Sequence, residues 1–158
     1  MLLLLILSCK NPKEVETKQE SPKQDTVVTE QSIEEPSFAI QSTNEQTAAN
    51  LRNFFTHDFL KEELQYLSEF ERQFQFFEID LNDDGKKEIF VRMFGPYFCG
   101  SGGCSFLLLD SYGEIITQFT VTRAPFFIEK ERKNGWSILL VKDAGVFKEL
   151  TFKNGSYD

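Results

Sequence analysis

The sequence has little histidine, little tryptophan and few basic residues for its acidic content. It holds one His, one Trp and three Cys among 158 residues, and 17 Lys and Arg stand against 25 Asp and Glu. The formal net charge of −8 argues against binding to a nucleic-acid backbone or to anionic lipid, because both need clustered cations. The apolar run at residues 2–7 is far shorter than the ~20 residues that cross a bilayer, which argues against a spanning helix there.

The single histidine limits both metal binding and catalysis. Zinc normally takes four ligands, and His57 is the only histidine, so zinc is disfavoured. A Ser-His-Asp arrangement would have to bring Ser101 to His57 across the boundary between the predicted helix and sheet. A glycosidase-like pair of carboxylates stays open because acids are abundant. We assign no catalytic residue and predict that the chain is not an enzyme.

What the chain does contain divides it into three parts. Residues 1–9 are an apolar leader that ends in a cysteine. Residues 10–47 are rich in Glu, Gln, Ser, Thr, Lys and Pro, and bury too little apolar surface to offset ordering entropy, so they are predicted to form a disordered, mildly acidic tether. Residues 48–158 are long enough for one domain, and the 17 Phe of the chain supply large side chains for a core.

The pattern of residues 48–158 predicts an α+β fold. Apolar residues first recur at steps of three and four, as in one amphipathic helix or a helix pair with Thr56 as the cap of the second helix. This apolar stripe consists of Leu51, Phe54, Phe55, Phe59, Leu60, Leu64, Leu67 and Phe70. After Arg72, short β-branched and aromatic segments alternate with turns such as the Asn-Gly pairs at 134–135 and 154–155. We therefore expect the N-terminal helix or helix pair to pack on one curled antiparallel β-sheet meander.

The segment DLNDDGKKE at residues 80–88 is the candidate metal site. Oxygen-bearing side chains stand at alternate positions, a glycine allows a sharp turn, and calcium prefers about six to eight oxygen ligands. The pattern resembles the D-x-N-x-D-G-x-x-[DE] calcium loops of FG-GAP-type repeats, and departs from the EF-hand because Val91 stands at the twelfth position. The resemblance implies a weak structural Ca²⁺ site, with ligands from Asp80, Asn82, Asp84, the carbonyl of Lys86, and Glu88. The alternative is a polar hairpin turn without a metal.

The leader MLLLLILSC gives the predicted location. Ile6, Leu7 and Ser8 before Cys9 resemble the lipobox of bacterial lipoproteins, although the apolar run is short and no Lys or Arg precedes it. The resemblance implies a signal peptide that is removed, a lipid on Cys9 and attachment to the cell envelope, on the periplasmic or surface face of the outer membrane. The alternative is an ordinary apolar N-terminus.

The second candidate loop is GPYFCGSGGCSF. If Cys9 carries lipid, Cys99 and Cys104 remain, and an even pair at short spacing in an exported protein indicates a disulfide, with a two-cysteine zinc site as the alternative. Tyr97 and Phe98 are candidates for an exposed aromatic contact with a partner, and Ser101 with the glycines for a small anion nest. The plainer interpretation is a stapled hairpin tip packed by its own aromatic residues.

The run DLNDDGKKEIFV…YFCGSGGCSFLLLD is similar to a family of bacterial exported lipoproteins, and this implies location and fold but no activity. The first functional hypothesis is a lipid-anchored envelope protein whose calcium-stabilised domain binds an unknown envelope protein. The second is a periplasmic inhibitor of an envelope hydrolase, with YFCGSGGC as the inhibitory element. The third, which the sequence disfavours, is an enzyme.

Overall fold

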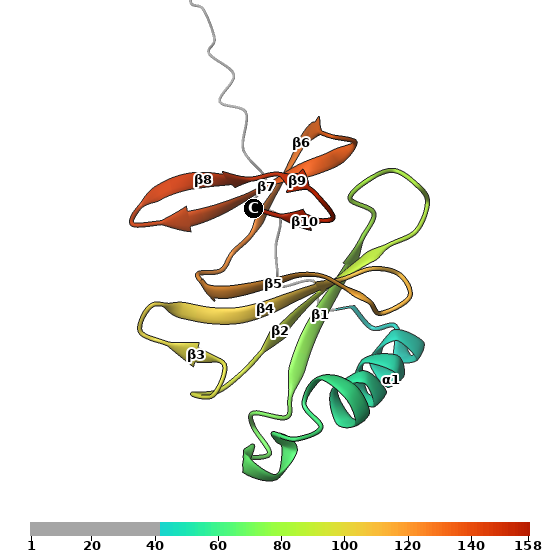
Figure 1. Ribbon diagram of the computed structural model, residues 1–158, viewed down its shortest axis with the longest axis vertical. Helices are drawn as coiled ribbons and strands as arrows, with labels where there is room; N and C mark the ends of the chain where they lie inside the picture. The colour runs from blue at the N-terminus through green and yellow to red at the C-terminus, as the bar shows by residue number, and fades with distance from the viewer. Residues whose placement is uncertain (1–41) are drawn as a thin grey trace, which may run out of the picture. The chain divides into compact units, whose positions relative to one another are not determined.

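The computed structural model describes residues 42–158, which form mainly antiparallel β-structure with one short α-helix (Figure 1). This is the α+β composition expected from the sequence. The lipidation site predicted at Cys9 and most of the predicted tether lie outside the described residues. Helix α1 (Glu45–Phe54) continues into one π-helical turn, η1 (Phe55–Phe59), and a 3-10 turn, η2 (Leu64–Tyr66), follows.

Ten strands follow the helical segments. They are β1 (Phe74–Ile79), β2 (Glu88–Met93), β3 (Cys99–Gly100), β4 (Gly103–Leu109), β5 (Ile115–Thr122), β6 (Phe127–Lys133), β7 (Trp136–Asp143), β8 (Val146–Leu150), β9 (Phe152–Lys153) and β10 (Ser156–Tyr157).

The start of the helix is fixed by Asn44. Its side-chain oxygen accepts the backbone N–H groups of Gln46 at 3.1 Å and Thr47 at 3.2 Å, which otherwise lack intrahelical partners. The Ser42 N–H donates to the carbonyl of Phe76 on β1 at 3.0 Å. Ser42, which precedes the expected domain start at position 48, is therefore already bonded to the first strand.

The described residues contain no second α-helix, so the alternative of a helix pair is wrong. Thr56, the predicted cap, lies inside η1, and between η1 and the first strand the chain forms only the short 3-10 turn η2. Leu60 and Leu67 are nevertheless buried, because the irregular segment brings them to the core without a helix. Phe70, the last residue of the predicted stripe, is exposed.

The strands form three sheets rather than the single meander expected. The largest has the order β1-β2-β4-β3 with β5 also paired to β4, the second has the order β6-β7-β8, and β9 pairs with β10. The strand pairings within residues 42–158 are antiparallel. Register shifts interrupt the β4–β5 ladder and Val121 near its end has φ 55°, and such irregularities bend a strand and end its pairing. Strand β6 accordingly pairs with β7 instead of extending the first sheet.

The central strands β2 and β4 are buried on both faces. Alternate side chains of each strand enter two separate clusters, one on each side of the first sheet. The first cluster joins Ile89, Val91, Met93, Leu107 and Leu109 to Leu51 and Phe55 of the helical segments. The second joins Phe90, Phe106 and Leu108 to Leu139, Val141 and Leu150 of the three-stranded sheet. The first sheet thus lies between the helical segments and the second sheet.

Two sets of hydrogen bonds connect the first sheet to the second. The Tyr157 N–H donates to the Thr117 hydroxyl of β5, and the Tyr157 hydroxyl donates to the Ser137 carbonyl of β7, at 2.9 and 2.8 Å. The Ser137 N–H donates to the carbonyl of Leu81, at 2.8 Å, just after β1. The β1–β2 loop, which holds the candidate metal ligands, is therefore attached to the second sheet.

Candidate functional site

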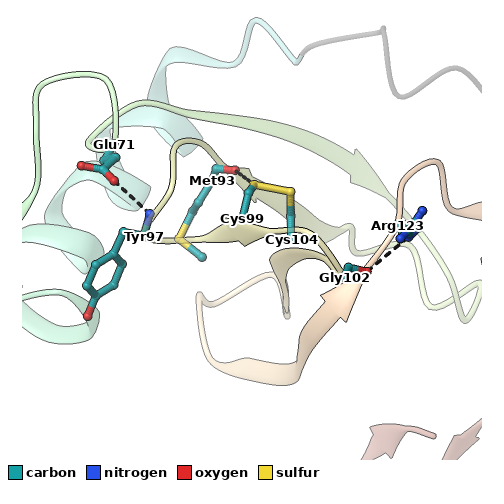
Figure 2. The surroundings of a disulfide bond; sticks show 7 residues. All are labelled: Glu71, Met93, Tyr97, Cys99, Gly102, Cys104 and Arg123. Carbon is teal, nitrogen blue, oxygen red and sulfur yellow. Dashed lines mark hydrogen bonds between the residues drawn. A yellow bond between two sulfur atoms is a disulfide. The ribbon is translucent and has the colours of Figure 1, made fainter.

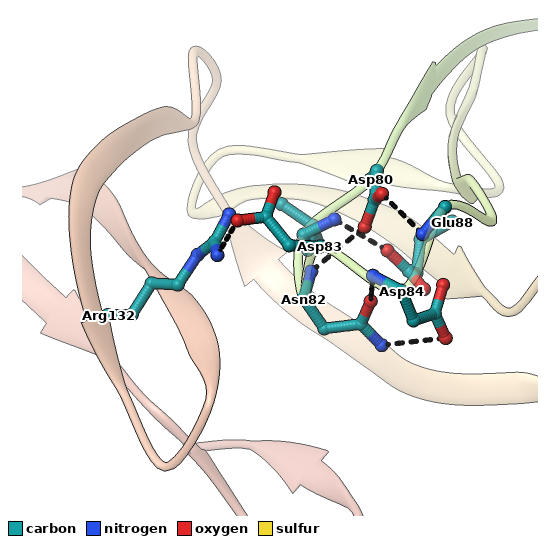
Figure 3. A network of polar contacts seen from close by, with 8 residues as sticks. Asp80, Asn82, Asp83, Asp84, Glu88 and Arg132 are labelled. Atoms are coloured by element: carbon teal, nitrogen blue, oxygen red, sulfur yellow. Dashed lines mark hydrogen bonds and ion pairs between the residues drawn. The ribbon is translucent and has the colours of Figure 1, made fainter.

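The β1–β2 loop is curled by its own side-chain oxygens (Figure 3). The Asp80 carboxylate accepts the N–H groups of Asn82 at 3.2 Å and Gly85 at 2.9 Å. The Asn82 amide oxygen accepts the Asp84 N–H at 3.0 Å, and the Asp84 carboxylate accepts the Lys86 N–H at 2.8 Å. Each alternate polar residue thus satisfies a backbone donor and turns the chain inward.

Gly85 makes this turn possible. It has φ 83°, where a side chain is strained, and no atom lies within 4 Å of the position that a Cβ would take. The glycine is therefore required by backbone conformation and not by crowding. Asp83 also has a positive φ, 59°, which Asp tolerates better than most residues.

Glu88 is the exceptional member of the loop because it is buried. Only 3% of the residue is exposed, and its carboxylate accepts the Leu81 N–H at 2.7 Å. Burial raises the pKa of Glu88, its bonds to backbone N–H groups act in the opposite direction, and the nearby carboxylates of Asp84 and Asp80 raise the pKa further. Within the described residues Glu88 has no ion pair with a Lys or Arg, although Lys86 lies near Asp84 and Arg132 lies near Asp80.

Asp83 has a different partner, which the sequence analysis did not find. Its carboxylate pairs with the Arg132 guanidinium on β6 (Figure 3), and this hydrogen bond lowers the pKa of Asp83 and raises the pKa of Arg132. Arg132 lies 49 positions along the chain, and no local pattern connects the two residues. The pair gives the loop a second attachment to the three-stranded sheet.

The loop fits a calcium ion by the chemistry of its donors rather than by a closed cage. All the side-chain groups predicted as ligands offer oxygen, which hard cations such as Ca²⁺ prefer, and an oxygen that accepts one N–H keeps a second lone pair. Over residues 42–158, no group of three or more His, Cys, Asp or Glu side chains is drawn together as in a metal site. The predicted ligand residues therefore lie on one loop, and their side-chain oxygens accept mainly backbone N–H groups.

The second candidate loop is closed by the disulfide between Cys99 and Cys104, which face each other on β3 and β4 (Figure 2). Two side chains hold the loop from outside. The Glu71 carboxylate accepts the Tyr97 N–H at 2.9 Å, and Arg123 donates to the carbonyls of Gly102 at 3.2 Å and Ser101 at 3.0 Å. Neither holding residue was identified from the sequence.

The two residues of the predicted aromatic contact differ in exposure. Tyr97 is 54% exposed, whereas Phe98 is 7% exposed and belongs to the first core cluster. The two rings contact each other with centroids 5.0 Å apart, so the exposed ring rests on the buried one. Ser101 is exposed at the loop tip, where its carbonyl, not its hydroxyl, makes the bond to Arg123.

The chain matches no protein-family model, no curated protein and no solved structure. None of the helices among residues 42–158 has the length and apolar character needed to cross a membrane.

Proposed function

We propose that the chain is a lipid-anchored protein of the bacterial cell envelope whose β-rich domain acts as a binding module and is stabilised by a structural Ca²⁺ ion in the β1–β2 loop. The ligands are the side-chain oxygens of Asp80, Asn82, Asp84 and Glu88 with the carbonyl of Lys86. The proposal assigns no catalytic activity to the domain. Its protein partner is a component of the same envelope.

The observation that carries the calcium proposal is the burial of Glu88. A hairpin turn needs Asn, Asp and Gly at its tip, but it does not need a buried carboxylate below them. A buried carboxylate is costly unless its charge is offset, and among the described residues Glu88 has backbone N–H groups but no cation for this, while the nearby Asp80 and Asp84 add to the cost. A divalent cation bound among these groups supplies the missing charge.

The position of the loop explains why the ion would be structural. Leu81 is fully buried in the second core cluster, its carbonyl accepts the Ser137 N–H, and Asp83 pairs with Arg132. The loop therefore joins the two larger sheets at three points. Neutralising its carboxylates favours the closed arrangement of this junction, so calcium is expected to stabilise the whole domain.

Thermal unfolding of the full chain tests the calcium proposal, with calcium, with magnesium and with EGTA. Calcium should raise the midpoint and magnesium should not, because magnesium demands a smaller octahedral cage and keeps its waters. Asp84→Asn should abolish the calcium shift. The matched control is Asp83→Asn in the same loop, which breaks the pair with Arg132 but should keep the shift. Superimposed curves for the wild type in all three conditions would show that the loop is only a turn.

The anchoring proposal has its own test at Cys9, which is outside the described residues. Bacteria expressing the full chain are grown with labelled palmitate, and the protein is recovered with the envelope fraction. The wild type should carry label and sediment with the membranes, whereas Cys9→Ser should lose both properties. Equal labelling of the two proteins would contradict the assignment of Cys9.

Inhibition of an envelope hydrolase is the second candidate function, and the disulfide loop favours it. Tyr97 is exposed on a loop fixed by a disulfide, by Glu71 and by Arg123, and a pre-organised projecting side chain binds without a large ordering cost. The test is the hydrolase activity of an envelope extract with added wild-type protein. Tyr97→Ala should lose inhibition, whereas Tyr66→Ala, which removes another exposed tyrosine, should retain it. Absence of inhibition by the wild type would exclude this candidate.

A further inference from the structure

A cleft of about 710 Å³ lies between α1 with η1 and the β4–β5 turn. Its volume falls within the range of small-molecule sites, which is about 300–1,000 Å³. Neither the calcium loop nor the disulfide loop lines it, so a role for this cleft goes beyond the function proposed above.

The walls of the cleft carry polar side chains with unused hydrogen-bonding capacity. Asn53 and Asp58 come from the helical side, and Ser111 and Glu114 come from the β4–β5 turn. Within residues 42–158 the side chains of these four make no hydrogen bond or ion pair with one another or with the rest of the domain. All four residues are exposed, so an amide donor, a hydroxyl and several acceptor oxygens are open to solvent at the cleft.

The π-helical turn η1 contributes to this arrangement. A π-turn inserts an extra residue into each hydrogen-bonded ring, which rotates the side chains that follow relative to an α-helix. In this protein it buries Phe55 in the core while Asp58 remains on the cleft wall. Such turns are often found at functional sites, since they reposition a side chain at some cost in helix stability.

Tyr112 provides an aromatic surface at the cleft. The residue is 78% exposed, yet its side chain is restrained by a contact with Lys86. The Lys86 ammonium donates to the Tyr112 hydroxyl at 2.9 Å and lies 4.9 Å from the ring centroid. Lys86 thus holds the hydroxyl end of the ring, and the exposure of the residue leaves ring surface available for stacking.

The composition of the cleft selects the class of ligand. No Lys or Arg is among the described residues that line it, which disfavours anions, and its free groups are too polar for an apolar ligand. The hydroxyl groups of a saccharide can donate to Asp58 and Glu114 and can accept from the Asn53 amide. The C–H face of its sugar ring can pack on Tyr112. We infer that this cleft binds a neutral saccharide, held by Asn53, Asp58 and Glu114 and stacked on Tyr112.

Isothermal titration calorimetry of the full chain tests this inference with three neutral tetrasaccharides: cellotetraose, maltotetraose and chitotetraose. At least one should bind at millimolar concentration. Tyr112→Ala and Asn53→Ala should each weaken that binding by about tenfold or more. The matched control is Tyr66→Ala, because Tyr66 is exposed to the same degree, 76%, and does not line the cleft. Thermal melts should show all three variants folded, since the altered side chains are exposed.

Three results would overturn the inference. The first is the absence of heat with all three tetrasaccharides. The second is equal weakening by Tyr66→Ala and Tyr112→Ala, which would place the ligand elsewhere. The third uses spermidine as a cationic probe. If spermidine binds, the double variant Asp58→Asn/Glu114→Gln abolishes that binding, and no tetrasaccharide binds, then the cleft is a cation site. None of these titrations compares calcium with EGTA. A failure of the saccharide inference can therefore be distinguished from a failure of the calcium proposal.

Discussion

Replacing Glu88 by Gln should have opposite effects on stability without and with calcium. Without calcium, burial raises the folded-state pKa of Glu88 above its ordinary value of 4.5. The folded state then binds this proton more tightly than the unfolded state, so the wild type loses stability as the pH rises from about 4.5 through the raised pKa. Gln carries no charge and keeps an oxygen for the Leu81 N–H. At pH 7 the variant in EGTA should therefore match or exceed the wild type.

With calcium the order should reverse, because the variant lacks one anionic ligand. Weak extracellular calcium modules have Kd values of about 10⁻⁴–10⁻³ M, so ~10 mM calcium is about 10–100 times Kd. Binding then adds about 1.4–2.7 kcal/mol to the free energy of unfolding of the wild type. For a domain of this size, about 4 °C per kcal/mol is expected, which gives a rise of roughly 5–10 °C in Tm.

The assay is thermal unfolding followed by circular dichroism at pH 7, for both proteins in calcium and in EGTA. The wild type should be the more stable protein only in calcium. Glu149→Gln, on the exposed side of β8, is the matched control and should leave both midpoints unchanged. A variant that is less stable by the same amount in both conditions would show that Glu88 acts only through its hydrogen bond to Leu81. A variant with the full calcium shift would show that Glu88 is not a ligand.

Three further predictions concern the rest of the domain. Reduction of the disulfide should lower the free energy of unfolding by about 2 kcal/mol, the loop-closure entropy of so short a loop, as measured by urea unfolding with and without reductant. Hydrogen bonds from Ser68 and from the Tyr97 N–H lower the pKa of Glu71, so the stabilisation that ionised Glu71 provides is complete above about pH 4.5 and is lost as the pH falls through the lowered pKa. In that acidic range the amide exchange of Tyr97 should accelerate beyond its intrinsic pH dependence. Unchanged protection of the Tyr97 amide would contradict the contact with Glu71. Tyr157→Phe should lower the free energy of unfolding by about 1 kcal/mol, and Tm by about 4 °C, because the Ser137 carbonyl loses its donor; an unchanged Tm would show that this link between the sheets carries no stability.

The local features of the fold were predictable because they are encoded in neighbouring residues. The Asn-Gly pairs at 134–135 and 154–155 adopt positive φ at both positions, as a tight hairpin requires. The disulfide was predictable from spacing, since two cysteines only five positions apart come to face each other when the chain between them makes a tight turn. In each case the information lies within a few residues of the feature.

The arrangement of the sheets was not predictable in the same way. The continuous apolar runs of β2 and β4 were recognised as strands, and such runs are typical of strands covered on both faces. What covers them depends on contacts between distant parts of the chain, such as Leu51 with Val91 and Leu139 with Leu108. The break between β5 and β6 depends on the bulged pairing with β4, which the sequence of β5 does not reveal by itself.

In the candidate site, too, the local features were predictable from the sequence and the long-range contacts were not. Alternate oxygen-bearing residues and Gly85 identified the loop, because these are properties of residues 80–88 alone. The burial of Glu88 and the partners of Asp83 and Tyr97 depend on Arg132, Glu71 and the second sheet, and they became apparent only from the structure.

The acidic residues of the β1–β2 loop have separable roles, and this separation bears on whether the loop is a turn or a metal site. Asp80 and Asp84 accept backbone N–H groups and so curl the loop into a turn. Asp83 pairs with Arg132 and attaches the loop to the second sheet. Of the acidic residues in this loop only Glu88 is buried, and no Lys or Arg of the described residues pairs with it. The two possibilities are therefore not exclusive: the turn is complete without calcium, and the buried carboxylate below it is the feature that calcium would explain.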